Sequence, residues 1–172
     1  MVDHMPKIIS SDENSIPFKK RPIKGVSLFV REDILSTMTD HADEGYLDNK
    51  EVMGLLIGNV NADDEGQYAT VTDIATTDLD ADVVSVRFRE DALEDLFRNI
   101  DRCKGDAIVG WYHSHLGVGC YLSDTDIRTH KGIFGDEMGF AIVIDPSVST
   151  LVPFSFSEGD QRKVPMVVMT ND

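Results

Sequence analysis

The stretch GWYHSHLGVGCYLSDTDIRT, residues 110–129, decides more about this chain than any other part of it. His113 and His115 lie two apart at the end of an apolar run that is typical of a strand, so both imidazoles should point to one face. After a glycine-containing loop, Ser123 and Asp126 form the S-x-x-D pattern of a helix N-terminus. Two imidazoles and one carboxylate make three ligands, which suits a catalytic zinc whose fourth position is open.

Each part of this pattern alone has an ordinary explanation. An isolated H-x-H pair usually means two histidines without a metal, and S-x-x-D alone is more often only a helix cap. The joint spacing H-x-H-x7-S-x2-D is far more specific than either part. Cys120 is a conceivable fourth ligand, but a closed site would leave no open position for catalysis, so we interpret it as a packing residue.

The combined pattern resembles the motif of the JAMM (MPN+) zinc metalloprotease family, especially its proteasome-lid deubiquitinase and COP9 signalosome deneddylase branches. The family also has a glutamate at the head of an apolar strand, and Glu51 before VMGLLIG, residues 52–58, supplies it. Alone, Glu51 would be interpreted as a carboxylate in water at a strand edge. The resemblance covers residues 26–156. Three loop positions depart from the family pattern and none is a ligand: Leu116 in place of proline, and Val118 and Tyr121 in place of larger aromatics.

The order of the expected elements indicates a mixed α+β (α/β) protein. The resemblance implies a single MPN/JAMM domain with a curved, mostly antiparallel sheet flanked by helices. It implies one Zn²⁺ per chain, bound by His113, His115 and Asp126. It further implies that Glu51 is the general base and that Ser123 donates a hydrogen bond to the oxyanion. The implied substrate is an isopeptide bond between the C-terminal glycine of ubiquitin, or of a ubiquitin-like protein, and a lysine amine.

A second implication of the resemblance concerns the segment 77–89, which in relatives lies beside the active site and pairs with the modifier's extended tail. Its strand-forming part is VVSVRF, residues 83–88, and we take Val84 and Val86 as the candidate substrate-binding residues. A tail that ends in glycines has little side-chain surface, so main-chain pairing with an exposed strand edge is a suitable way to hold it. The alternative is an ordinary internal strand.

Bulk composition restricts the function classes. A length of 172 residues suits one domain, with 41% hydrophobic and 27% charged residues. The net charge of −15 argues against a nucleic-acid partner, and no apolar run is long enough to span a membrane. Two cysteines make no disulfide framework, so a reducing, cytoplasmic setting is expected.

We expect residues 1–24, which are polar and contain three prolines, to form a flexible tail before a catalytic domain at 25–172. Helices are expected at 31–43, ending at Gly45, and at 90–104, with His41 on the surface of the first. His130 shares a helix side with Asp126 and is expected behind the ligands or on the surface. Strands are expected at 26–30, 51–60, 67–76, 83–88, 107–112, 139–144, 153–157 and 164–169.

Three alternatives to a deubiquitinase remain from the sequence. A JAMM peptidase that processes a ubiquitin-like sulfur-carrier protein would use the same site. A structural MPN subunit of a proteasome-like assembly would not need the metal ligands, and a proteasome or ATPase complex is a candidate partner for an active subunit as well. A zinc nucleoside deaminase would need H-x-E and P-C-x-x-C, and this chain has neither.

Overall fold

The computed structural model describes residues 7–11, 21–81, 86–157 and 160–171. Its strands are β1 (Lys7–Ser11), β2 (Leu28–Arg31), β3 (Met53–Asp63), β4 (Gly66–Ala75), β5 (Leu79–Ala81), β6 (Val86–Phe88), β7 (Ala107–Ser114), β8 (Gly139–Asp145), β9 (Thr150–Ser157), β10 (Asp160–Lys163) and β11 (Met166–Asn171). Its helices are α1 (Glu32–Leu47), α2 (Leu93–Arg102) and α3 (Asp124–Phe134), with short 3-10 turns η1 (Glu90–Ala92) and η2 (Pro146–Val148).

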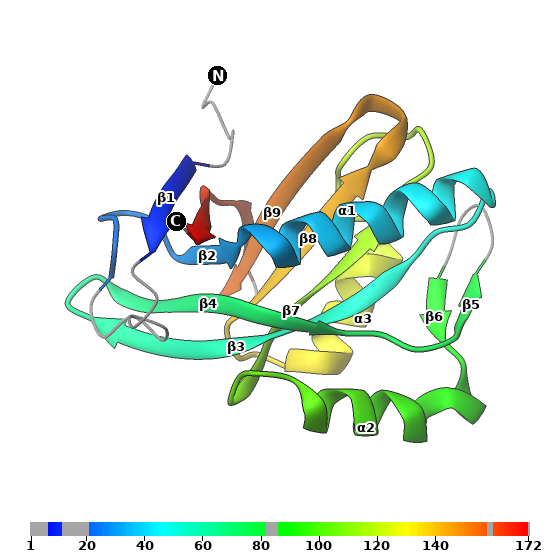
Figure 1. Cartoon of the computed structure of the whole chain (residues 1–172), viewed down its shortest axis with the longest axis horizontal. Coiled ribbons are helices and arrows are strands. Elements are labelled where there is room, and N and C mark those ends of the chain that lie inside the picture. The colour runs from blue at the N-terminus through cyan, green and yellow to red at the C-terminus, as the bar shows by residue number, and fades with distance from the viewer. Residues whose placement is uncertain (1–6, 12–20, 82–85, 158–159, 172) are drawn as a thin grey trace.

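The described strands form one large sheet in the order β1-β11-β2-β4-β3-β7-β8-β9-β10, and β5 pairs with β6 in a separate small sheet. The pairings of β3 with β4 and β7, and of β9 with β8 and β10, are antiparallel. Parallel pairings join β1, β11, β2 and β4 at one side and β7 to β8 near the middle. Figure 1 shows the sheet curving, with β3 and β4 crossing the view and β8 and β9 rising steeply. The antiparallel pairings contain most of the paired residues, so the predicted α+β class and curved, mostly antiparallel sheet are confirmed.

Helices cover both faces of the large sheet, which explains why β3 is apolar on both sides. Leu56 belongs to the core that packs against α1, whereas Met53, Leu55 and Ile57 belong to the core against α2 and α3. In Figure 1, α1 crosses one face, and α2 and α3 lie on the other. The strand expected at 51–60 is therefore a central strand, buried on both faces over the first six residues of β3.

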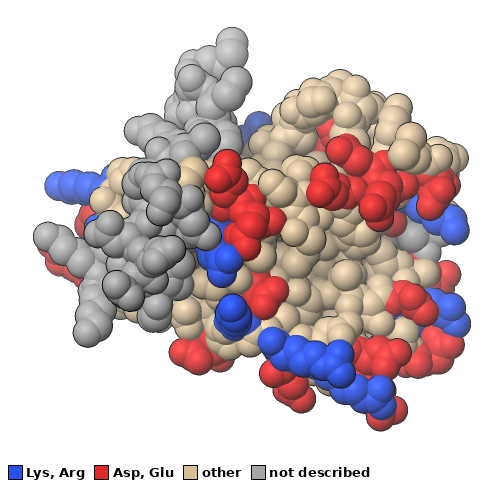
Figure 2. Space-filling view, in the orientation of Figure 1, with Lys and Arg blue, Asp and Glu red and all other residues tan. Residues whose placement is uncertain are grey.

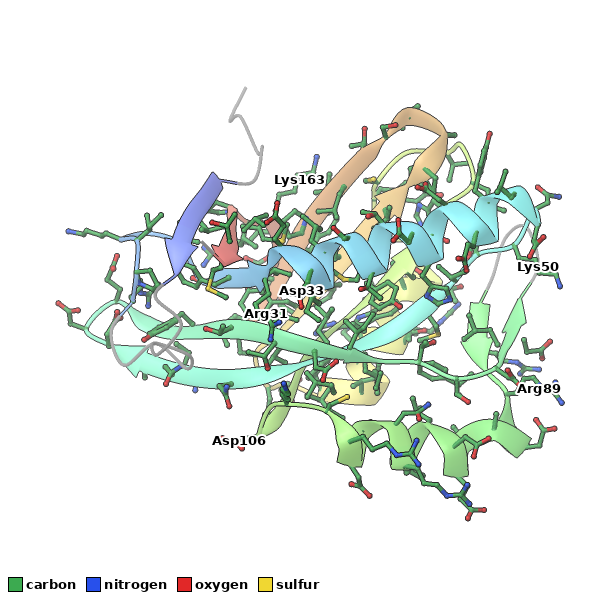
Figure 3. The ribbon with its side chains drawn as sticks, in the orientation of Figure 1. Arg31, Asp33, Lys50, Arg89, Asp106 and Lys163 are labelled. Carbon is green, nitrogen blue, oxygen red and sulfur yellow. The ribbon has the colours of Figure 1, made fainter. Side chains whose placement is uncertain are left out.

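The first helix is longer than predicted. α1 begins after Arg31, which pairs with Asp33 (Figure 3), and it passes Gly45 to end at Leu47. Gly45 was expected to end the helix, but it lies buried inside it. Only glycine fits there, because a side chain would collide with Val52. The glycine thus serves packing and does not serve chain reversal.

The outer side of α1 carries much of the acidic charge. Figure 2 shows acidic side chains gathered along this helix, and its exposed acids are Glu32, Asp33, Asp40, Asp43 and Glu44. Such a polar outer face with a buried inner stripe is usual for a helix that covers a sheet. His41 was expected on the helix surface, but it is half-buried and its Nδ1 lies 2.8 Å from the hydroxyl of Tyr112.

Two further expectations need correction. Residues 79–81 lie outside the expected strands but form β5, and the helix expected at 90–104 is divided into η1 and α2. Val84 lies outside the described residues. None of the described helices combines the length and the apolar character needed to cross a bilayer.

The first 24 residues are not wholly a tail. β1 pairs in parallel with β11. Arg21 is buried, and its guanidinium binds Asp63 at 2.8 Å and the carbonyl of Val26 at 3.0 Å. These two parts therefore contact the folded domain, and the flexible tail at 1–24 and the domain boundary at residue 25 stay predictions.

Gly58 provides a test of how closely the central strands approach. A Cβ at this position would overlap the carbonyl oxygen of Thr70 on β4, and the Gly58 carbonyl also accepts from Asp106 N–H (Asp106 is labelled in Figure 3). We expect Gly58→Ala to lower the free energy of unfolding by about 3 kcal/mol. The control is Gly132→Ala on the open side of α3, where a Cβ meets nothing within 4 Å. It should raise stability by about 0.5–1 kcal/mol. Urea unfolding measures both, and a Gly58→Ala variant as stable as wild type would contradict this packing.

Candidate metal centre

Three side chains from two elements meet at one point. His113 is near the end of β7, His115 follows that strand, and Asp126 lies in the first turn of α3. The Oδ2 atom of Asp126 is 3.1 Å from His113 Nε2 and 3.4 Å from His115 Nε2, and the two Nε2 atoms are 3.2 Å apart. The structure therefore brings together the three residues that the sequence proposed as ligands, and they form a group that could hold a metal ion.

The S-x-x-D pattern creates a capping box. Ser123 Oγ accepts from the N–H of Asp126 at 3.1 Å, and Asp126 Oδ2 accepts from the N–H of Ser123 at 2.8 Å. The ordinary interpretation of this pattern is thus correct, and the carboxylate still faces the imidazoles. A hydroxyl that accepts one hydrogen bond retains its own hydrogen for donation. Ser123 can therefore cap the helix and still donate toward the site.

The orientation of His115 favours metal binding. Its Nδ1 lies 2.8 Å from the carbonyl oxygen of Gly119, which can only accept, so Nδ1 carries a hydrogen and the neutral ring offers the lone pair of Nε2. His113 is held differently. Its ring stacks on Trp111 with centroids 4.5 Å apart, and no group in the described part of the chain bonds to its buried Nδ1. The mixture of imidazole nitrogen and carboxylate oxygen suits zinc.

The cluster is electrostatically coupled. Burial raises the pKa of Asp126, but hydrogen bonds from His113 and His115 outweigh burial and hold that pKa well below its usual range. Burial lowers the pKa of His113, and Asp126 opposes this effect only in part. Burial also acts to lower the pKa of His115, yet Asp126, the Gly119 carbonyl and Glu51 together raise it. A carboxylate and a neutral His113 are the forms that bind a metal.

Glu51 is buried, follows Lys50 (labelled in Figure 3) and lies two residues before Met53, which pairs with His113. Its carboxylate contributes to the raised pKa of His115, which places its charge close to that ring. The neighbouring main chain is fixed because Val52 N–H donates to Ser114 Oγ at 2.8 Å and Ser114 N–H donates to the Val52 carbonyl at 2.9 Å. Glu51 is therefore not a carboxylate in open water.

A supporting layer lies behind the ligands, and it contains His130, which was expected there or on the surface, and Trp111, to which the sequence assigned no role. Trp111 Nε1 donates to His130 Nδ1 at 3.1 Å, and the ring of His130 stacks on Phe156 with centroids 3.6 Å apart. His130 thus supports the tryptophan on which His113 stacks. In the sequence, the position of His130 one helical turn after Asp126 was the only indication that it lies behind the ligands. Cys120 donates to the carbonyl of Thr150 and is not part of the ligand cluster.

The comparisons with known proteins agree with this geometry. A family model described as JAB1/Mov34/MPN/PAD-1 ubiquitin protease matches residues 24–134. COP9 signalosome complex subunit 5 of Gibberella zeae is 34% identical over 136 residues, which are 76% of this chain and 38% of that protein. Ubiquitin carboxyl-terminal hydrolase RPN11 of Saccharomyces cerevisiae is 31% identical over 123 residues, 70% of this chain and 39% of that protein. The chain thus spans less than two-fifths of the length of these relatives.

A solved structure supports the fold alone. The solution structure of protein DSY2949 from Desulfitobacterium hafniense is similar with a TM-score of 0.53 at 18% identity. The similarity covers 82% of this chain and 92% of that chain.

The buried His130 should make stability depend on pH. Burial lowers its pKa to about 4, whereas histidine in an unfolded chain titrates near 6.5. Between these values the unfolded chain binds more protons, so stability rises with pH from about 4 to about 6.5 and then levels off. The amide of a His130→Gln variant can still accept from Trp111 but does not titrate. We therefore expect the free energy of unfolding of this variant to lack the slope due to His130, which is at most about 1.4 kcal/mol per pH unit. Urea unfolding of both proteins across this range measures it, and a stability difference independent of pH would contradict the assignment.

Proposed function

Since the chain belongs to the JAB1/Mov34/MPN/PAD-1 ubiquitin protease family, as its motif predicts, we propose that it is a zinc-dependent isopeptidase. It would remove ubiquitin or a ubiquitin-like modifier from conjugated proteins. The observation that carries the proposal is the convergence of His113, His115 and Asp126 beside the buried Glu51. The relative named as a ubiquitin carboxyl-terminal hydrolase supports the reaction class.

The proposed mechanism assigns one task to each residue. His113, His115 and Asp126 would hold the zinc, which when bound supplies a Lewis acid that polarises the carbonyl and makes water easier to deprotonate. Glu51 takes the proton of the attacking water and passes it to the departing lysine amine, so that one carboxylate serves as base and then as acid. The Ser123 hydroxyl donates to the developing oxyanion, which is worth about 3 kcal/mol for donors of this kind.

We further propose that the outer edge of β6 holds the modifier's tail. Arg89 N–H donates to the Asp78 carbonyl at 3.1 Å, and hydrogen-bonded pairs alternate along an antiparallel ladder. The next hydrogen-bonded pair is therefore Arg87 with Asp80, and the main chain of Val86 faces away from β5. In the part of the chain that the structure describes, no other strand pairs with this edge. An extended tail could add there as a third strand. Val84 remains a candidate from the sequence.

Two alternatives stay open at the level of substrate and assembly. Processing of a ubiquitin-like sulfur-carrier protein would use the same residues, and only cleavage assays with both substrate classes separate the two. A structural MPN subunit is less favoured because the ligand group is complete. The relative named as a signalosome subunit makes a complex partner a reasonable proposal, and a proteasome or ATPase assembly remains the candidate from the sequence. A cytoplasmic location stays a prediction.

Glu51→Gln tests the function most directly. We expect this variant to retain one zinc per chain and the wild-type melting temperature but to lose conjugate cleavage, because an amide cannot accept the proton. The control is His113→Ala combined with His115→Ala, which should lose both zinc and cleavage. Elemental analysis and a conjugate-cleavage assay measure the two properties. Near-normal cleavage by Glu51→Gln would overturn the mechanism, and two zinc ions per wild-type chain would overturn the metal assignment.

Ser123 has two proposed roles, which two substitutions separate. Ser123→Ala should lower stability by about 1 kcal/mol through the lost cap. Through the lost oxyanion donor, it should lower kcat about 100-fold with little change in KM. Ser123→Gly removes the same hydroxyl but costs a cap only a few tenths of a kcal/mol. It should therefore show the full kinetic loss at near wild-type stability. If Ser123→Gly turns over normally, Ser123 is only a cap.

Proline substitutions test the proposed tail edge. Val86→Pro removes an N–H that faces away from β5, so it should weaken conjugate cleavage while zinc content and the melting transition stay as in wild type. Arg87→Pro is the matched comparison, because it removes an N–H that the alternation directs toward β5 and should disturb the small sheet itself. Cleavage at the wild-type rate by Val86→Pro would place the tail elsewhere.

A further inference from the structure

Asp145, at the end of β8, is a buried carboxylate that the proposed reaction does not use. It accepts hydrogen bonds from the N–H groups of Gly117 at 3.1 Å and Gly119 at 2.6 Å. It also accepts from the N–H of Ser147 at 3.1 Å and from its hydroxyl at 2.6 Å. Burial acts to raise the pKa of Asp145, but these donors outweigh burial and lower it, so the group is an anion held by neutral donors.

Two of these donors belong to the loop that joins the ligands. Residues 116–122 lead from His115 to the helix cap at Ser123, and the loop has no proline at its first position. Gly117 and Gly119 have φ values of 90° and 85°, a region that favours glycine. A flexible loop of this kind needs an external anchor to hold one shape, and Asp145 binds it at both glycines.

Gly119 connects this anchor to the metal ligand. Its N–H binds Asp145, and its carbonyl accepts from Nδ1 of His115 at 2.8 Å. Ile144, the residue before Asp145, provides a second hydrogen bond to this region, since its carbonyl accepts from the His115 N–H at 2.8 Å. The end of β8 therefore controls both the main chain and the ring of His115.

We propose that Asp145 is a positioning residue: through the Gly117 and Gly119 amides it places the Gly119 carbonyl, which fixes His115 with Nε2 directed toward Asp126. The inference rests on the proposed function, since it gives this ring a metal to bind. Groups that orient metal ligands in this way are worth about 10–100-fold in metal affinity or activity when they are removed.

Asp145→Asn tests the proposal, because it keeps the shape of the side chain but presents an NH₂ group to at least one amide donor. We expect zinc affinity, measured by competition with a chromophoric chelator, to fall about 10–100-fold. The second readout is ¹⁵N NMR of the imidazoles in zinc-free protein. At a pH where His115 is neutral, the wild-type ring should carry its hydrogen on Nδ1, and the variant should show a mixture of tautomers. A general loss of packing would not produce this tautomer change.

Ser147→Ala is the matched control. It removes one hydrogen bond to the same carboxylate but leaves both loop amides in place. Zinc affinity and the His115 tautomer should therefore remain as in wild type. An equal fall in zinc affinity in Ser147→Ala would show that any change around Asp145 has this effect. It would contradict the proposal that Asp145 acts through the loop amides.

Gly119→Ala keeps the proposal testable if Asp145→Asn does not fold. An added Cβ there meets nothing within 4 Å, but the positive φ strains the loop. The same fall in affinity and the same tautomer mixture are expected. Wild-type affinity and tautomer in a folded Asp145→Asn, or in Gly119→Ala where the first variant is unfolded, would overturn the proposal. Neither readout needs conjugate cleavage, so the inference can stand when the proposed isopeptidase activity fails, and can fail when that activity stands.

Discussion

The antiparallel pairing of β3 with β7 is the interaction on which the candidate site depends. Met53 lies opposite His113, and Val52 and Ser114 exchange main-chain and hydroxyl hydrogen bonds just beyond it. This register places Glu51 beside the histidines, although more than sixty residues separate them in the chain. A slip of one residue would turn His113 toward the opposite face of the sheet, so the register specifies the chemistry as well as the packing.

The sequence predicted those parts of the site that are formed by residues close together in the chain. The alternation at His113 and His115 and the cap formed by Ser123 and Asp126 each depend on a few neighbouring residues, and both occur as expected. The general position of Glu51 followed from the family pattern. The principal strands were predictable for the same reason, since an apolar run bounded by turns is a local signal.

The misses arise where distant contacts outweigh local preference. Glycine is the residue type that commonly ends a helix, but at Gly45 the side chain of Val52, just before β3, makes a small residue necessary inside the helix. Asp145 is 28 residues from Gly117 in the chain and becomes its partner only because β7 and β8 are neighbours. Arg21 was assigned to a tail because nothing nearby in the sequence indicates its partner, Asp63. Propensity and spacing carry no information about such pairs.

The capping box at Ser123 has a consequence for how a metal would reach the proposed site. The N-terminus of α3 is closed by Ser123 and Asp126 through hydrogen bonds that need no ion. The surrounding sheet has its own apolar cores on both faces. Small zinc domains whose ligands supply the folding energy are unfolded without metal. Here we expect the fold to form without a metal, so that the proposed ion could be bound, released and exchanged without unfolding. Amide hydrogen exchange along α3 should then be equally slow with and without a chelator. Fast exchange after metal removal would exclude a fold that is independent of the metal.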